Sequence, residues 1–159
     1  MGDRLRSRVN VLLVCLIVAG IVGFDRFTKI FFVSSLSVGE SIPIIRHVFH
    51  FTLVHNTGIA FGLFKNQGMV FVIIPIIAIV LIVFNMYYYR NDSEVTHVYI
   101  IAFSLILGGA IGNLTDRILY GHVIDFIDFR IWPVFNIADS AITIGTTILL
   151  IKCIPLFAK

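Results

Sequence analysis

The stretch from Gly108 to Asp139 reads GGAIGNLTDRILYGHVIDFIDFRIWPVFNIAD and lies between two strongly apolar runs. The chain has nine acidic residues, and this stretch holds four of them: Asp116, Asp125, Asp128 and Asp139. Ionisable side chains near bilayer depth are costly unless they pair, so they mark functional sites by default. The stretch therefore predicts a functional site at a membrane surface.

The composition of the whole chain indicates an integral membrane protein. Of its 159 residues, 58% are hydrophobic and 13% are charged, and the mean hydropathy is +1.00. Soluble domains carry about 25% charged residues. A chain of this length predicts one domain covering residues 1–159. The net charge of +3 is small and scattered, so no nucleic-acid partner is expected.

Four apolar runs predict transmembrane helices at about residues 9–26, 68–89, 97–115 and 137–157. The first run resembles a signal peptide, but no small-residue cleavage site follows it, so we expect a retained helix. In the third run, Gly108 and Gly112 have the spacing that lets helices approach closely.

The segment at about residues 34–65 has no run long enough to span a membrane. Between Ile45 and Leu53 apolar side chains recur at every second position, which is typical of a half-buried strand. An open sheet edge cannot lie in lipid. The predicted fold class is therefore a membrane all-α protein with four transmembrane helices and a small β-sheet on the extracytoplasmic membrane surface.

The orientation follows from the charges beside the first helix. Arg4, Arg6 and Arg8 precede it directly, which favours a cytoplasmic N-terminus. Four spans then place both termini in the cytoplasm, and the polar stretches 25–66 and 115–136 face outward together.

Asp125 and Asp128 have different surroundings in the extended-looking stretch that contains them. Asp125 alternates with Val123 and Ile127 and therefore shares an apolar face. Burial raises the pKa of such a carboxyl group, and a second carboxylate nearby raises it further. Asp128 shares the other face with Arg130, so we expect a solvated ion pair there.

Asp139 and Asp116 each allow two interpretations. Asn136-x-x-Asp139 is typical of a helix N-terminus with an asparagine cap, but Asp139 could equally be the second carboxylate of an acid–base pair. Asp116 and Arg117 could form a helix-end charge pair, or Arg117 could orient a carboxylate.

Other reaction classes have weaker support. No HExxH or GxSxG motif is present. A serine–lysine dyad of Ser34 or Ser35 with Lys29 is conceivable. A polar-lined transporter or a lipid-binding protein stays open as a non-enzymatic alternative. The two cysteines, Cys15 and Cys153, lie in apolar runs and indicate neither a disulfide nor a metal site.

Five motifs in order along the chain resemble the bacterial lipoprotein signal peptidase (signal peptidase II) family. They are Asp25-Arg26-x-x-Lys29, Asn56-Thr57-Gly58-Ile59-Ala60-Phe61-Gly62, Gly109-Ala110-x-Gly112-Asn113-x-x-Asp116-Arg117, Val123-Ile124-Asp125-Phe126 and Phe135-Asn136-Ile137-Ala138-Asp139. The resemblance implies an intramembrane aspartyl endopeptidase of the bacterial inner membrane, with its site towards the outer face. It would remove the signal peptide of prolipoproteins before a cysteine that carries diacylglycerol.

The resemblance assigns the catalytic pair to Asp125 and Asp139, and it implies neither a metal nor an organic cofactor. The expected partners are lipidated prolipoprotein and membrane lipid, and a monomer is expected. The segment between the two aspartates is short, so a wide lid is not expected. The supporting or substrate-binding residues would be Asp25, Lys29, Asn56, Gly58, Asn113, Asp116, Arg117, Asn136 and Ala138.

Overall fold

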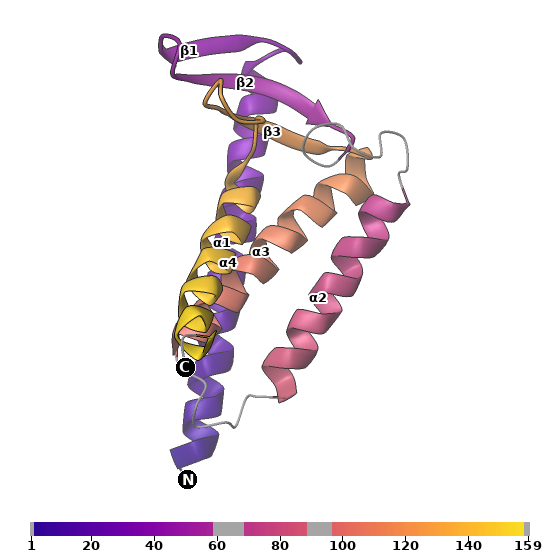
Figure 1. The fold of residues 1–159 in the computed structure, drawn as a ribbon. Coiled ribbons are helices and arrows are strands. Elements are labelled where there is room, and N and C mark those ends of the chain that lie inside the picture. The colour runs from indigo at the N-terminus through magenta and orange to yellow at the C-terminus, as the bar shows by residue number, and fades with distance from the viewer. Residues whose placement is uncertain (1, 59–68, 89–96, 158–159) are drawn as a thin grey trace.

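Four helices stand beside one another, and a small sheet lies across one end of them (Figure 1). The computed structural model describes residues 2–58, 69–88 and 97–157. The helices are α1 (Gly2–Ser35), α2 (Val70–Tyr88), α3 (His97–Tyr120) and α4 (Ile137–Phe157). The strands are β1 (Ser41–Ile45), β2 (Phe49–Asn56) and β3 (Val123–Asp128).

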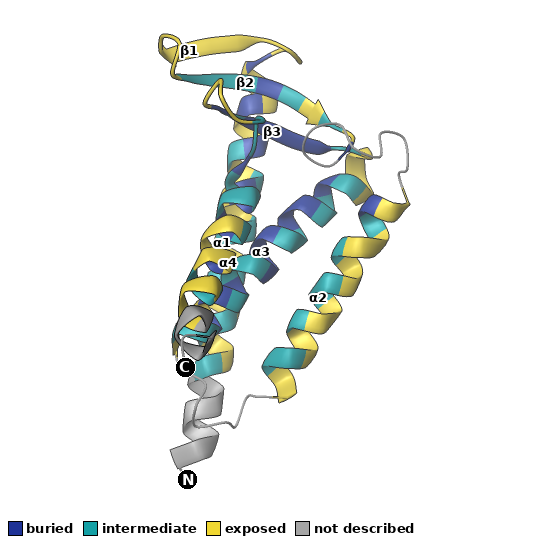
Figure 2. Cartoon of the chain, viewed as in Figure 1, coloured by how far each residue is buried: buried dark blue, intermediate teal, exposed yellow. Residues whose placement is uncertain are grey.

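Among the described residues, three helices are long and apolar enough to cross a membrane, over Asn10–Ser35, Val70–Tyr88 and His97–Tyr120. On α2 most side chains are exposed or half-buried (Figure 2), and Phe71 is its buried residue. Apolar side chains that face outward suit lipid as the surrounding medium. α4 covers the range of the predicted fourth span, but the side chains after Lys152 lie outside the described residues, so that span stays a prediction.

α1 is longer than the expected span of 9–26. It continues to Ser35, so Lys29 lies on the helix and not in a loop after it. The side chains of Asp25 and Lys29 are 2% and 0% exposed, because they pair with each other and gain partners from α4 and α3, respectively. A charge that ends an apolar run in the sequence can therefore lie inside a helix when another helix neutralises it.

The sheet contains three antiparallel strands in the order β1-β2-β3. The first two form a hairpin whose turn contains His47 at φ 63°, so the expected alternation runs through a turn. β3, expected only as an extended stretch, pairs with β2 and joins segments far apart in the sequence. The predicted fold class, a membrane all-α protein with a small β part, is confirmed.

A core of apolar side chains joins the sheet to the upper end of α1. It contains Phe32, Leu36, Leu53, Ile124 and Phe126. The rings of Phe32 and Phe126 stack with centroids 4.3 Å apart. Because Phe126 adjoins Asp125 on β3, this packing fixes the height of β3 relative to the helices.

α3 packs closely on both α1 and α4 through glycines. A Cβ atom on Gly108 would lie 3.0 Å from the Ile21 Cβ atom of α1, and one on Gly109 would lie 2.3 Å from the Ala138 carbonyl oxygen of α4. The expected close approach at Gly108 and Gly112 is therefore observed, and Gly109 adds to it.

Candidate active site

Asp125 and Asp139 lie on different elements and are joined by two asparagines. The Nδ2 group of Asn136 donates to Oδ1 of Asp125 at 2.7 Å, and Nδ2 of Asn113 donates to Oδ1 of Asp139 at 2.7 Å. The two asparagines also bond to each other, from Asn136 Nδ2 to Asn113 Oδ1, at 3.0 Å. The side chains of β3, α3 and α4 thus form one continuous hydrogen-bonded network.

The first turn of α4 has the predicted cap. The Asp139 N–H donates to Oδ1 of Asn136 at 2.8 Å, and the Asn136 N–H donates back to Oδ2 of Asp139 at 3.3 Å. This reciprocal arrangement satisfies helix N–H groups that lack a partner within the helix. The cap aims Asp139 towards Asn113, so the two interpretations of Asp139 are compatible.

Asp125 is 1% exposed and accepts hydrogen bonds from two asparagines. Its second oxygen, Oδ2, accepts a hydrogen bond from Asn56 Nδ2 of β2 at 2.9 Å. Burial and, second to it, repulsion from Asp139 together raise the pKa of Asp125 to about 7, against the opposing effect of the bonds from Asn56 and Asn136. A carboxyl group with such a pKa can exchange a proton near neutral pH.

Lys29 lies at the centre of a second, fully buried network beneath the aspartates. Its Nζ atom lies 2.8 Å from Asp25 Oδ2 and 2.8 Å from Asp116 Oδ2. It also donates to Asn113 Oδ1 at 3.2 Å. Since Asn113 accepts through its oxygen, its NH₂ group is free to point at Asp139. The charge network therefore orients an amide that touches the candidate site.

Arg26 completes this network and is absent from the predicted supporting residues. Its Nη1 atom lies 3.2 Å from Asp116 Oδ1, and its other nitrogen donates to the Tyr120 hydroxyl group. Asp116 forms its ion pairs with Lys29 and Arg26, while Arg117 is attracted electrostatically to Asp139 and Asp125 as well as to Asp116. Of the two interpretations of Arg117, the one in which it acts on a candidate carboxylate is therefore the better supported. Consecutive residues of a helix point about 100° apart, so Asp116 and Arg117 of α3 face different neighbours although they adjoin in the sequence.

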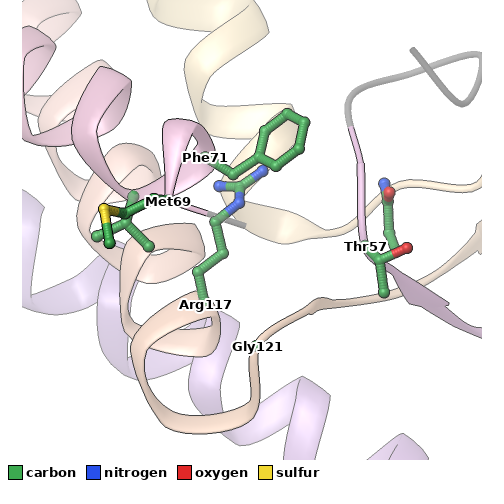
Figure 3. Close-up of a pocket in the computed structure, with 7 residues that line it drawn as sticks. Thr57, Met69, Phe71, Arg117 and Gly121 are labelled. Atoms are coloured by element: carbon green, nitrogen blue, oxygen red, sulfur yellow. The ribbon is translucent and has the colours of Figure 1, made fainter. Parts of the chain in front are cut away.

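Arg117 points into a cavity beside Asn56. The cavity has a volume of about 320 Å³, and Figure 3 shows the Arg117 side chain reaching from α3 towards Phe71. Arg117 is close enough for electrostatic attraction to Asp125 and Asp139. The lining residues are Asn56, Thr57, Met69, Phe71, Val72, Arg117 and Gly121. Met69, Phe71 and Val72 belong to an apolar run without any motif, so no sequence signal marks them.

Gly58 and Ala138 take part through their backbones. The Gly58 N–H donates to Oδ1 of Asn56 at 3.1 Å, which fixes the amide that faces Asp125. The Ala138 N–H donates to Oδ1 of Asp25 at 2.9 Å, and its side chain is fully buried. A Cβ on Gly112 would lie 3.3 Å from the Ala138 methyl group, so only small residues fit between these helices.

Asp128 differs from the expectation in its burial. The predicted ion pair with Arg130 is present at 2.9 Å, but Asp128 is 5% exposed and not solvated. Thr52 Oγ1 donates to its carboxylate at 2.7 Å across the sheet. β3 is covered on both faces near its end, so alternation alone does not separate its buried and solvated residues.

The alternative serine–lysine dyad is wrong. Ser34 and Ser35 lie within α1, and their hydroxyl groups donate to the Phe31 carbonyl oxygen at 2.8 and 2.7 Å. The Lys29 ammonium group is held by Asp25 and Asp116 instead. The serines are therefore bonded to the helix backbone and have no base.

Comparisons with known proteins agree with this arrangement. The family profile described as signal peptidase (SPase) II matches residues 11–155. The lipoprotein signal peptidase of Halothermothrix orenii is 41% identical over 139 residues, 87% of this chain and 93% of that one. That of Moorella thermoacetica is 42% identical over 129 residues, 81% and 84% of the two chains.

A solved bacterial membrane enzyme, determined by the in meso method at 2.3 Å resolution, has the same fold. Its TM-score is 0.81 and its sequence identity 35%, over 90% of this chain and 88% of that one. Fold, site and relatives together define a multi-pass membrane protein of the aspartic peptidase class. Within that class, the chain belongs to the signal peptidase II family.

Proposed function

We propose that this peptidase removes the signal peptide of prolipoproteins whose cysteine carries diacylglycerol, cleaving before that cysteine, with Asp125 and Asp139 as its catalytic pair. The relatives are lipoprotein signal peptidases. One observation carries the assignment of the pair. The Asn136 side chain binds Asp125, the Asn113 side chain binds Asp139, and the two asparagines are hydrogen-bonded to each other.

The proposed chemistry starts from one proton shared by two carboxyl groups. Two neighbouring carboxylates do not both ionise readily, and the raised pKa of Asp125 is consistent with a proton held there. The ionised group takes a proton from water, which attacks the scissile carbonyl carbon. The protonated group donates to the carbonyl oxygen, and a proton then reaches the leaving amine as the C–N bond breaks.

The charges around the pair support a single negative charge on it. Asp25 and Asp116 are balanced by Lys29 and Arg26 in the lower network. Arg117 then remains to offset one ionised carboxylate of the catalytic pair. An ion pair of this kind costs less at membrane depth than a second isolated anion.

The cavity beside Asn56 is the proposed location of the substrate next to the scissile bond. Arg117 can donate to a carbonyl oxygen there, while Met69, Phe71 and Val72 supply apolar contacts for the lipid. Each buried methylene group of an acyl chain contributes about 0.8 kcal/mol. The rings near Asp125 in the sequence lie elsewhere: Phe126 belongs to the core beneath the sheet, and Phe129 stacks on Phe49 and Phe135.

The remaining expected residues have supporting roles in this proposal. Lys29, Asp25 and Asp116 hold α1, α3 and the start of α4 together. Gly58 fixes Asn56, and Ala138 allows the close approach of α4 to α3. Asp25 lies ten residues before the end of α1, about 15 Å along the helix axis. The proposed site therefore lies below the sheet, within the outer leaflet of the cytoplasmic membrane. The proposal takes the protein to act as a monomer.

The test replaces each aspartate by a side chain of the same shape. Asp125→Asn and Asp139→Asn should each lower cleavage of a lipidated prolipoprotein about 10²- to 10⁴-fold or more. The double variant should be scarcely slower than either single one, because residues that act as a unit are not additive. Cleavage is measured per folded molecule by release of the signal peptide.

Asp128→Asn is the matched control, three residues further along β3. It loses the ion pair with Arg130 and therefore some stability, but turnover per folded molecule should stay. An unlipidated prolipoprotein, offered to the unmodified enzyme, should be cleaved poorly. Substantial turnover by a well-folded Asp139→Asn protein would refute the catalytic pair, and equal cleavage of both substrates would refute lipid recognition.

A further inference from the structure

Two histidines that are far apart in the sequence form a stacked pair at one end of the β2–β3 ladder. His55 lies at the end of β2 and His122 just before β3, and their ring centroids are 3.9 Å apart with an interplanar angle of 25°. Neither side chain belongs to the catalytic pair or to the two hydrogen-bonded networks that support it. The pair fastens the last residues of the β2–β3 ladder.

The stacked pair is adjacent in the sequence to the residues that hold Asp125. His55 precedes Asn56, whose Nδ2 group donates to Asp125, and His122 precedes Val123, the register partner of Asn56. Gly121, before His122, lines the cavity and has φ 74°. A change in the separation of the two rings would therefore move both the Asn56 amide and one wall of the cavity.

The surroundings of the rings favour the neutral state. From α3, the Tyr120 ring lies 6.1 Å from His122, and from α1 the Arg26 guanidinium group lies 5.1 Å from the Tyr120 ring centroid. In the part of the chain that the structure describes, no carboxylate bonds to either histidine. Asp116, which contacts Arg26, is already paired with Arg26 and Lys29. His55 is exposed, and the limited desolvation by its neighbours lowers its pKa, as does the charge of His122. Two protonated rings here would repel each other and Arg26.

We propose that His55 and His122 are positioning residues: their neutral, stacked rings hold Asn56 against Asp125, and protonation of the rings in mild acid releases this end of β2. The proposal rests on the catalytic role proposed for Asp125. Cleavage should then fall in mild acid because the Asn56–Asp125 contact is lost, a cause separate from the protonation of the catalytic pair itself.

The experiment compares three forms of the full-length enzyme with a lipidated prolipoprotein between pH 5 and pH 8. The double variant H55F/H122F keeps two stacking rings that cannot be protonated, and H55A/H122A removes the stack. The Phe pair should keep kcat at pH 7.5 within about twofold, and its acid midpoint should lie at least about half a pH unit below that of the unmodified enzyme, since the histidine titration is gone. The Ala pair should lose kcat several-fold at pH 7.5 with little change in KM.

Coincident acid limbs for the unmodified enzyme and the Phe pair would overturn the proposal. Histidine-ring NMR titration of the unmodified protein gives a second, independent measurement if the Phe pair does not fold. The pKa of His55 should lie below that of a free histidine, and an ordinary pKa for His55 would contradict the stack. Failure of the proposed function looks different: the unmodified enzyme would then cleave at no pH, or Asp125→Asn would stay active.

Discussion

At the scale of single residues, Asn136 has two structural roles at once. Its oxygen caps α4 by accepting the Asp139 N–H, and its NH₂ group reaches three acceptors, namely Asn113 Oδ1, the Ile124 carbonyl oxygen and Asp125 Oδ1. An amide NH₂ group has only two N–H bonds, so two of the three acceptors must share one of them. A fully buried side chain in this position ties the start of a helix to a strand, and both candidate catalytic groups depend on it.

Asp125 should also make stability depend on pH. Its pKa is raised to about 7 in the folded protein, whereas the unfolded chain releases this proton near 3.8. The folded state therefore binds more protons between these values, and the free energy of unfolding should fall as pH rises from about 4 to about 7, by at most about 4 kcal/mol. Asp125→Asn should lack this fall.

The measurement is unfolding by SDS titration in mixed micelles at several pH values. Glu40→Gln is the matched control, because its carboxylate is exposed and accepts a hydrogen bond from the Ser37 N–H. It should keep the slope of the unmodified protein. A slope in Asp125→Asn equal to that of the unmodified protein would mean that Asp125 stays ionised throughout.

At the scale of elements, the distance between α3 and α4 decides whether Asn113 reaches Asp139. A Cβ on Gly109 would lie 2.3 Å from the Ala138 carbonyl oxygen, one residue before Asp139. Backbone atoms cannot yield as a flexible side chain does, so the helices must separate. The absence of a side chain at Gly109 therefore lets α3 and α4 come close enough for Asn113 to bond to Asp139.

Gly109→Ala should therefore destabilise the protein by about 1–3 kcal/mol and slow cleavage in the molecules that fold. Gly23→Ala in α1 is the matched control, since its Cβ would meet nothing within 4 Å. It should be neutral or stabilising by up to about 1 kcal/mol, because alanine favours helix. Thermal unfolding and initial cleavage rates test both variants; equal behaviour of the two would show that α3 and α4 can move apart without consequence.

The same elements show what the sequence could and could not predict. Long apolar runs and period-2 alternation follow from local chemistry, so the helices and the presence of a sheet were predictable. The end of α1 was not predictable, because Asp116, one of the two counter-charges of Lys29, lies on a helix that is distant in the sequence. The partners of Asp116 and the α2 wall of the cavity depend on packing between helices, for which one sequence has no local signal. The aspartates themselves were identifiable because a carboxylate is costly among apolar residues.

At the scale of the whole molecule, the two segments expected to face outward together do meet at one end. β2 comes from the first and β3 from the second, and they form one sheet (Figure 1). We predict that this end lies outside the cell, because the arginines before α1 favour a cytoplasmic N-terminus. In a variant without native cysteines, Ser37→Cys should react with a membrane-impermeant maleimide in intact cells.

An arginine-flanked position gives the control for this labelling. Ser7→Cys, between Arg6 and Arg8, keeps all three arginines and should react only after the cells are opened. Labelling at residue 7 but not at residue 37 in intact cells would reverse the orientation and put the proposed site on the cytoplasmic side.

The intrahelical pair of Lys29 and Asp25 also bears on the order in which the protein is made. α1 enters the bilayer well before the ribosome has finished α3, since Asn113 follows Lys29 by 84 residues. During that interval Lys29 lacks Asp116 and Asn113, but Asp25, one helical turn away, lies 2.8 Å from its ammonium group. The nascent helix therefore carries a counter-ion for Lys29, and α3 later adds Asp116 and Asn113 as further partners of the same ammonium group.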